Sequence, residues 1–300
     1  MTTIVMKFGG ASLATAAQFD AIASLVVRKR QEYANVVTVV SAMGTTTDQL
    51  IGLAKEVHPE PPQREYDMLL SVGERISMAL LAMAIHKKNH KAVSFTGSQS
   101  GIITTCDHTE AKIIDVRPHR LLKSLESDHI VIVAGFQGVS RDGEITTLGR
   151  GGSDTTAVAL AIALGAEKVE FYKDVPGVFS DDPKTTPEAK SYDRISYDDV
   201  LKITAKGAKI LHERSVLLAK RHGIPLHVLS FKENEGHSGT LIEHEHSQAV
   251  EPLAKFALEA KFDDFGDSQK FCNSDKSADF APNRNIARGS EGEKIYEMLT

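Results

Sequence analysis

The sequence predicts an α/β fold built on a central, mostly parallel β-sheet, and three observations support this fold class. A short apolar strand at residues 4–8, an amphipathic helix at 16–30 and a β-branched strand at 35–40 open the chain. Residues 129–134 form a nearly continuous apolar run, as in strands that are buried on both faces. A small-residue helix at 155–164 resumes the alternation. Alternating strands and helices are typical of parallel sheets covered by helices.

The remaining elements follow from the same patterns. We predict further strands at 92–95, 168–172 and 225–229, an extended segment at 102–105, and helices at 66–88, 117–126, 197–206 and about 208–222. Asp142-Gly143 is a hairpin signal, and Ser196 with Asp199 indicates a capping box. The composition becomes polar after about residue 245. We therefore expect one folded domain at 1–245 and a polar tail at 246–300 that contains short helices at most.

The bulk composition argues against several classes of partner. Three hundred residues, 41% of them hydrophobic, are enough to bury a core, and a net charge of −5 leaves no basic surplus for nucleic acid or anionic lipid. Cys106 and Cys272 are far apart and suggest no disulfide framework. No signal-peptide pattern is visible, and the longest apolar stretch, near 78–85, is too short to span a bilayer. We expect a cytoplasmic protein without nucleic-acid or membrane partners.

A glycine-rich turn stands between the predicted hairpin and the helix at 155–164. Gly149, Gly151 and Gly152 allow a tight turn whose N–H groups can approach an anion. Ser153 is expected to cap the following helix, where a phosphate or carboxylate binds favourably. Arg150 adds a guanidinium fork that suits a carboxylate. An ordinary capped strand-to-helix turn remains the alternative.

Five polar turns each follow a predicted strand. They are residues 7–10, 41–48, 135–138, 149–154 and 173–179. Because ligands bind outside the carboxyl ends of parallel strands, we expect these turns to meet at one edge of the sheet. Their lysines, hydroxyls, carboxylates and backbone N–H groups suit phosphoryl transfer. The P-loop motif is absent from the sequence, and Asp154 breaks the dinucleotide-binding fingerprint.

Seven short segments stand in a characteristic order. They are Lys-Phe-Gly-Gly at 7–10, Ser-Ala-Met-Gly-Thr-Thr-Thr-Asp at 41–48, Ser-Val-Gly-Glu-Arg at 71–75, Thr-Leu-Gly-Arg-Gly-Gly-Ser-Asp at 147–154, Asp-Val-Pro-Gly-Val at 174–178, Gly-Ala-Lys-Ile-Leu-His at 207–212 and Gly-Thr-Leu-Ile at 239–242. In register over about residues 3–243, they resemble the aspartate kinase family. The resemblance implies a three-layer α/β/α amino-acid-kinase fold at 1–245. It also implies transfer of the γ-phosphoryl group of MgATP to the β-carboxylate of L-aspartate. The product, 4-phospho-L-aspartate, opens the diaminopimelate route to lysine, threonine and methionine.

The resemblance assigns catalytic roles to Lys7, Asp154 and Lys209. Lys7 would neutralise charge on the transferred phosphoryl group, and Lys209 would reach the phosphates of ATP. Asp154 would orient the lysines rather than act as a base, because the aspartate carboxylate is already ionised. The plainer alternatives are a solvated strand-end lysine for Lys7 and a helix-dipole interaction for Asp154.

The resemblance also divides the remaining site residues between two substrates. On the aspartate side, Arg150 would clamp a carboxylate and Glu74 would pair with the ammonium group. The other aspartate-side positions are Ser41, Thr47, Phe136 and Ser153. For two of these positions a structural role is an equal alternative: Thr47 would be a helix N-cap, and Phe136 would be a core residue. The nucleotide-side positions are Lys7, Gly9, Gly10, Lys173, Asp174, Phe179, Lys184 and Lys209. Mg²⁺ is expected on phosphate oxygens and water, without a dedicated protein site.

The sequence departs from the family pattern at several places. Ala11 and Lys173 stand where the family usually has threonine, and Glu213 stands where it has proline. We expect these three differences to affect the rate of the reaction and the affinity for the nucleotide more than the type of reaction. Residues 246–300 are too few and too polar for the usual pair of ACT regulatory modules, so we expect no ordinary feedback inhibition by lysine or threonine. Both a homodimer and a separate regulatory subunit stay open.

Two alternative functions remain. The first is another kinase of the same fold, such as acetylglutamate kinase or UMP kinase, which the segments at 71–75 and 147–154 argue against. The second is a weakly active scaffold that partners a regulatory subunit. Retention of Lys7, Glu74, Arg150, Asp154 and Lys209 argues against the scaffold.

Overall fold

The computed structural model describes residues 2–181, 186, 188–208, 210–231 and 238–245. The strands are β1 (Thr3–Phe8), β2 (Asn35–Val40), β3 (Ala92–Phe95), β4 (Ile102–Thr104), β5 (Ile113–Val116), β6 (Ile130–Ala134), β7 (Gln137–Ser140), β8 (Ile145–Thr147), β9 (Lys168–Lys173), β10 (Arg194–Ser196), β11 (Leu226–Ser230) and β12 (Thr240–Glu243). The helices are the short 3-10 turn η1 (Gly10–Leu13) and α1 (Ala16–Glu32), α2 (Thr46–Val57), α3 (Gln63–Leu70), α4 (Val72–Lys87), α5 (His119–Glu126), α6 (Gly152–Leu164), α7 (Tyr197–Ala205) and α8 (Glu213–His222).

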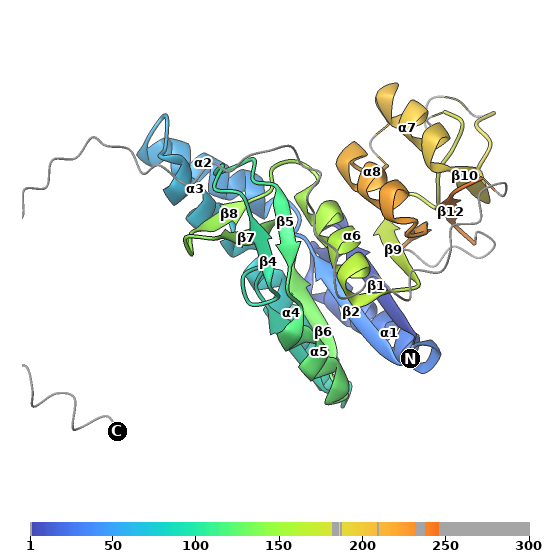
Figure 1. Ribbon diagram of the computed structural model, residues 1–300, viewed down its shortest axis with the longest axis horizontal. Helices are drawn as coiled ribbons and strands as arrows, with labels where there is room; N and C mark the ends of the chain where they lie inside the picture. The colour runs from blue at the N-terminus through green and yellow to red at the C-terminus, as the bar shows by residue number, and fades with distance from the viewer. Residues whose placement is uncertain (1, 182–185, 187, 209, 232–237, 246–300) are drawn as a thin grey trace, which may run out of the picture. The chain divides into compact units, whose positions relative to one another are not determined.

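Within these ranges, eight strands form the central sheet in the order β10-β12-β11-β9-β1-β2-β6-β3. Figure 1 shows β1 and β2 of this sheet with the helix α6 beside them. Every neighbouring pair is parallel except β11 and β12. The predicted mostly parallel sheet is therefore confirmed. β1 lies between β2 and β9, so that Lys7 stands level with Val39 and Phe171. Because β2, β1 and β9 are parallel, their carboxyl ends lie at the same edge of the sheet.

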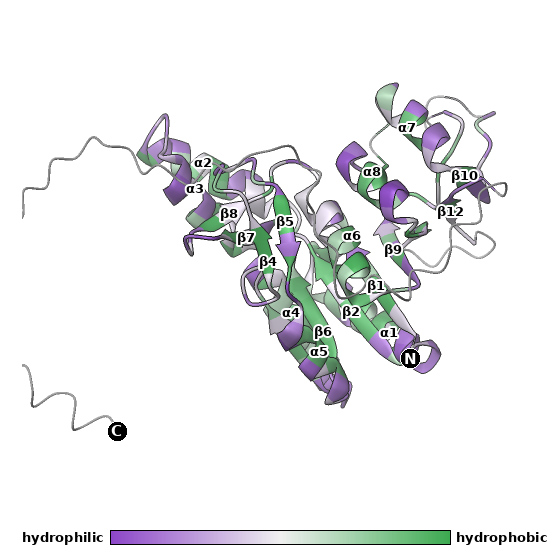
Figure 2. Cartoon of the chain, viewed as in Figure 1, coloured by the Kyte–Doolittle hydropathy of each residue, from purple (hydrophilic) through white to green (hydrophobic). Residues whose placement is uncertain are grey.

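Helices cover both faces of this sheet because successive strand residues point to opposite sides. Ile4, Met6 and Phe8 pack with α1 and α4, whereas Val5 lies in the other core layer with α5, α6, α7 and α8. The inner strands β1, β2 and β6 are hydrophobic along most of their length (Figure 2). The helix α6 is buried nearly all round, and its alanines allow it to approach the sheet closely. These layers match the expected α/β/α architecture.

A second sheet, in the order β5-β4-β7-β8, was not predicted. The Asp142-Gly143 signal correctly marks the turn between β7 and β8. The predicted polar turn at 135–138 is partly wrong, because Gln137 and Gly138 belong to β7. A short polar strand next to glycine resembles a turn in sequence, and only pairing with β4 and β8 distinguishes the two.

Two predicted helices have different bounds in the structure. The predicted helix at about 208–222 begins too early, because the His212 imidazole caps α8 by accepting from the Arg214 N–H at 3.4 Å. The helix predicted at 66–88 runs from Gln63 to Lys87 across the junction of α3 and α4. By length and composition alone it could cross a membrane. Its buried residues pack against the sheet, and core helices pass the same test.

The described residues belong to a unit that spans Met1–Ser268. The predicted boundary near residue 245 stays a prediction, and the predicted tail at 246–300 lies outside the described residues.

Candidate active site

Three ionic side chains meet at the carboxyl edge of the central sheet. Lys7 is the next-to-last residue of β1, Lys173 is the last residue of β9, and Asp154 lies in the first turn of α6. The Nζ atom of Lys7 lies 2.6 Å from Oδ1 of Asp154, and Nζ of Lys173 lies 3.5 Å from Oδ2. Parallel pairing of β1 and β9 brings the two lysines to one carboxylate although they are far apart in sequence.

The charges in this cluster are strongly coupled. Burial raises the pKa of Asp154, but the nearby Lys7 and Lys173 outweigh it and lower the pKa to about 2. Burial lowers the pKa of Lys173, and the charge of Lys7 acts in the same direction, against the attraction of Asp154. With two lysines around one carboxylate, this group of three side chains carries a net positive charge. This edge of the sheet therefore suits an anion.

Two turns close over the ends of β1 and β2. The N–H of Ser41 donates to the Phe8 carbonyl at 3.1 Å, and the N–H of Gly44 donates to the Gly10 carbonyl at 3.0 Å. A Cβ atom at Gly10 would lie 2.8 Å from the Ala42 carbonyl oxygen. A side chain at position 10 is therefore incompatible with this packing. At Gly9 a Cβ would meet only Nζ of Lys7, at 3.7 Å, so the backbone beside the lysine is open.

Glu74 contributes a buried carboxyl group to the same region. The helix α4 carries it inward, where Oε1 accepts from the Ala42 N–H at 3.1 Å. Oε2 has no hydrogen-bond partner among the described residues. Burial raises the pKa of Glu74 to about 7, although two backbone N–H groups and the charge of Lys7 oppose the rise. A buried acceptor without a partner is costly, and an incoming ammonium group would satisfy it.

The glycine-rich turn differs in detail from the prediction. The N-cap of α6 is Gly151 rather than Ser153, and it has a left-handed φ of +73°. A Cβ at Gly151 would lie 2.1 Å from the His212 ring, so both the conformation and the space require glycine. Ser153 lies one residue inside α6 and packs against Gly135, where a Cβ would meet Oγ of Ser153 at 2.8 Å. Its hydroxyl faces the turn after β6 instead of capping the helix.

Arg214 supports this turn and was not predicted. Its Nη2 donates to the Leu148 carbonyl at 2.9 Å and to the Arg150 carbonyl at 2.6 Å. Arg150 itself is exposed in the glycine-rich turn. Recognition of backbone carbonyls leaves no spacing pattern in a sequence, so no sequence signal could have identified Arg214.

A second unpredicted group is the carboxylate of Asp67, on the buried face of α3. Oδ1 accepts from Oγ1 of Thr147 at 2.5 Å, and Nδ1 of His108 lies 2.8 Å from Oδ2. The N–H of Thr109 lies 3.1 Å from both oxygens. Thr109 has a φ of +68°, which is rare for a β-branched residue. Asp67 thus ties α3 to the residue at which the glycine-rich turn begins.

The other predicted aspartate-side residues lie around the same edge. Ser41 is half-buried directly after β2. Thr47 lies inside the first turn of α2, whose N-cap is Thr45, so the N-cap interpretation of Thr47 is wrong. Phe136 follows β6 with a φ of +70° and donates its N–H to Oγ1 of Thr156 at 3.2 Å. Such backbone strain is concentrated at functional sites.

The predicted nucleotide side is described only in part. Asp174 is exposed beside Lys173, and Phe179 is half-buried and pairs with Ser191 in an isolated bridge. Lys184 and Lys209 lie outside the described residues. Within the part of the chain that the structure describes, no cluster of three His, Cys, Asp or Glu residues is placed to hold a metal ion.

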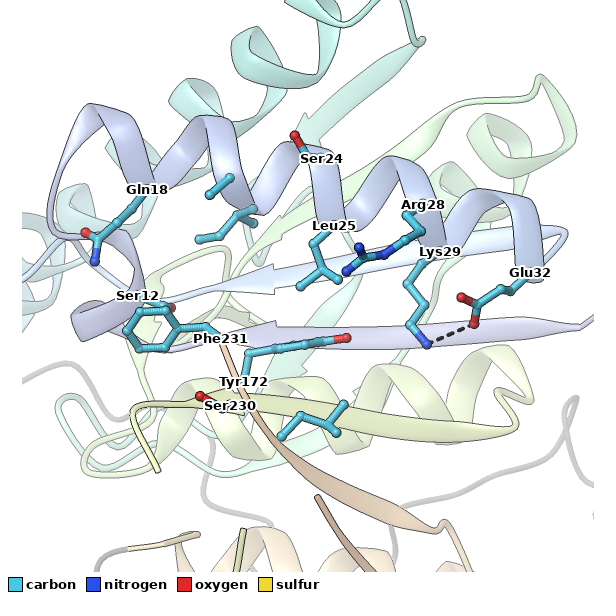
Figure 3. A pocket seen from close by; sticks show the side chains of 13 residues that line it. Ser12, Gln18, Ser24, Leu25, Arg28, Lys29, Glu32, Tyr172, Ser230 and Phe231 are labelled. Carbon is cyan, nitrogen blue, oxygen red and sulfur yellow. Dashed lines mark hydrogen bonds and ion pairs between the residues drawn. The ribbon is translucent and has the colours of Figure 1, made fainter. Parts of the chain in front are cut away.

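A large open cavity of about 750 Å³ lies elsewhere, between α1 and the residues at the ends of β9 and β11 (Figure 3). Gln18, Leu25 and Arg28 of α1 face Tyr172 and Phe231 across it. None of the predicted site residues lines this cavity. The candidate site therefore rests on the ionic cluster and not on this cavity.

The sheet and its charged edge define a protein of the amino acid kinase class. The model of the "Amino acid kinase family" matches residues 2–230, and the chain belongs to that family. It is 51% identical over 245 residues to an aspartokinase of Geobacillus stearothermophilus, covering 82% of this chain and 60% of the relative. The chain thus spans about 60% of that relative's length.

Solved structures agree with this assignment. The structure of aspartate kinase from Synechocystis has a TM-score of 0.73 and 42% identity, and the match covers 83% of this chain and 41% of that one. Escherichia coli aspartokinase III in complex with aspartate and ADP has a TM-score of 0.73 and 28% identity, with coverages of 81% and 65%.

Proposed function

We propose that this chain is the catalytic part of an aspartate kinase, which transfers the γ-phosphoryl group of MgATP to the β-carboxylate of L-aspartate. The observation that carries the proposal is the buried Oε2 atom of Glu74, which has no hydrogen-bond partner in the described part of the chain and lies within the electrostatic reach of Lys7. An acceptor for an ammonium group beside a cluster that attracts phosphate fits an amino-acid substrate. The relatives named aspartokinase support the same choice.

Lys7 and Lys173 supply the charge that phosphoryl transfer requires. Their ammonium groups would stabilise negative charge that develops on the phosphoryl oxygens, in a site from which water is largely excluded. Asp154 keeps both ammonium groups in place through its two oxygens. With a pKa of about 2, Asp154 is a poor proton acceptor. This fits a reaction whose nucleophile is already an ionised carboxylate.

Glu74 and Arg150 would orient the amino acid. The Glu74 carboxylate would receive the α-ammonium group, and the exposed Arg150 guanidinium would bind a carboxylate in bidentate fashion. Ser41, Thr47, Phe136 and Ser153 would complete the aspartate pocket. Together these contacts would hold the β-carboxylate toward Lys7 and so lower the entropic barrier to transfer.

The nucleotide would lie on the side of Lys173, with its phosphates over the open backbone at Gly9 and beside the closely packed Gly10. Asp174 and Phe179, together with Lys184 and Lys209, would form the rest of the nucleotide site. Mg²⁺ would reach the site with the phosphates and would supply charge neutralisation there. The residues described fit this arrangement, because they offer cations and backbone N–H groups rather than a metal cage. A cytoplasmic location likewise remains a prediction from composition.

The test is a hydroxamate assay with the full chain. MgATP and hydroxylamine are incubated with L-aspartate, glutamate or N-acetylglutamate, and the acyl hydroxamate is measured. We expect product with aspartate alone. Product with N-acetylglutamate instead would point to a different kinase of the fold, and no product with any substrate would favour an inactive scaffold.

A further inference from the structure

Arg214 joins the start of α8 to the glycine-rich turn. It is the second residue of α8, and its Nη2 donates to the carbonyls of Leu148 and Arg150, at 2.9 and 2.6 Å. Leu148 and Arg150 flank Gly149, which has a left-handed φ of +68°. A nitrogen that bonds to both carbonyls fixes the path of the backbone through Gly149. Within the described ranges, no other donor reaches the Arg150 carbonyl.

The direction of the Arg150 side chain follows from this backbone. Arg150 is exposed, and among the described residues its guanidinium has no hydrogen-bond or ion-pair partner. It stands between Gly149 and Gly151, which both have a left-handed φ. A side chain without contacts of its own is directed by its backbone alone. Arg214 therefore determines where the guanidinium that is expected to bind aspartate points.

The start of α8 is a tightly bonded unit. The His212 carbonyl accepts from both the N–H and the hydroxyl of Ser215, at 2.9 and 2.6 Å. The His212 ring lies against the glycine-rich turn, where a Cβ at Gly151 would come within 2.1 Å of it. Val216, one turn further along, is fully buried in the core. The start of α8 thus contacts the turn twice, through Arg214 and through His212.

The same helix start follows directly on the expected nucleotide segment at 207–212. Lys209, which lies outside the described residues, is expected to reach the phosphates of ATP, and His212 stands three residues after it. A ligand that restrains this segment also restrains the residues that begin α8. The Arg214 side chain is 34% exposed, and Glu110 lies 3.9 Å from its Nη1. Because burial does not hold this side chain, its order depends on the order of the helix start.

We propose that Arg214 is a positioning residue that couples the binding of the two substrates, an inference that rests on the function proposed above. Nucleotide bound along 207–212 would restrain the start of α8, and the two hydrogen bonds of Arg214 would pass that restraint to the turn that carries Arg150. Aspartate would then bind to a turn that is already ordered, at a smaller cost in conformational entropy. Because coupling is reciprocal, aspartate would strengthen nucleotide binding by the same factor.

The test measures binding without turnover. Calorimetric titration of the full chain gives the Kd of L-aspartate with and without saturating MgADP, and the Kd of MgADP with and without L-aspartate. In the wild type, each ligand should lower the Kd of the other by about 5-fold or more. Arg214→Ala should abolish this coupling, while the Kd of MgADP alone changes little. The matched control is Lys220→Ala in the last turn of α8, where the lysine pairs with Asp198; it should keep the coupling.

Hydrogen exchange gives a second measurement. MgADP alone should slow the exchange of the backbone N–H groups at 148–152 in the wild type but not in Arg214→Ala. A wild type that binds the two ligands independently would overturn the proposal and leave the proposed function in place. So would an Arg214→Ala protein that binds both ligands more weakly but keeps the wild-type coupling, since that is the mark of a merely structural role. A wild type that does not bind L-aspartate at all would overturn both.

Discussion

The ammonium group of Lys7 and the carboxylate of Asp154 form a buried ion pair at the point where β1 ends and α6 begins. Their side chains are exposed by only 6% and 8%. Each is held by regular structure: β1 is paired on both sides, and α6 is buried against the sheet. The direction of the lysine is therefore set by the core of the fold, and this rigidity leads to the first two predictions.

Lys7→Ala should reduce kcat by about three orders of magnitude or more, because it removes a preorganised charge from the site of transfer. Turnover is measured with the hydroxamate assay. The matched control is Lys29→Ala. It removes a lysine of α1 from another buried carboxylate, that of Glu170 in β9. The control should keep its turnover. Near-normal turnover of Lys7→Ala would remove Lys7 from the mechanism.

Asp154→Asn should lower both activity and stability, and the loss of stability should depend on pH. The folded-state pKa of about 2 lies below the ordinary 3.8, so the carboxylate contributes stability above pH 3.8 that is lost as the pH falls through 2. The contribution is on the order of 2 kcal/mol. Urea unfolding of wild type and variant should show a gap that is constant above about pH 5 and narrows in acid. A gap independent of pH would contradict this account.

Aspartate binding should depend on the ionisation of Glu74. Its raised pKa of about 7 means that the carboxyl group is partly protonated near neutral pH in the free protein. Only the ionised form pairs with an ammonium group, so the KM for aspartate should fall as the pH rises from about 6 to 8. Glu74→Gln should raise the KM by about 10-fold or more and remove this pH dependence. A variant that keeps the wild-type pH profile would assign the titration to another group.

The raised pKa of Glu74 has a second consequence, for stability. Between the ordinary value of 4.5 and about 7, the folded protein binds more protons than the unfolded chain. This group therefore lowers stability progressively as the pH rises through that window. Glu74→Gln should reduce the slope of unfolding free energy against pH between 5 and 7, as measured by urea titration. An unchanged slope would show that Glu74 is not buried in its neutral form.

Asp67 should act on aspartate binding through the turn that contains Arg150. Thr147→Val removes the hydroxyl that donates to Asp67, whereas Thr147→Ser keeps it. We expect the valine variant to raise the KM for aspartate several-fold while the KM for ATP changes little, and the serine variant to behave like wild type. Glu170→Gln, which changes another fully buried carboxylate, controls for a general loss of stability. Equal effects on both KM values would indicate a structural role only.

Much of the fold could be predicted from the sequence because its signals are local. Apolar periodicity placed β1, α1, β2 and β6, and Asp142-Gly143 marked the β7–β8 turn. The short motifs led to the amino acid kinase family, to which the chain belongs. The wrong predictions concern single residues at the starts of helices. Ser153 has the chemistry of an N-cap, yet the left-handed Gly151 begins the helix in its place. The helix predicted from about residue 208 begins only at Glu213, after the His212 cap.

What the sequence by itself determined, then, was the succession of strands and helices and the set of polar turns at the strand ends. Only the tertiary structure decided which of these residues meet. Lys173 reaches Asp154 because β9 pairs with β1, and Asp67 reaches Thr147 across eighty residues because α3 packs beside β8. The helix that spans Gln63–Lys87 is apolar on both sides, and the packing of one side against the sheet determines which residues remain exposed. Spacing along a chain encodes local geometry, whereas contacts between distant segments arise only when the sheet and its helices pack together.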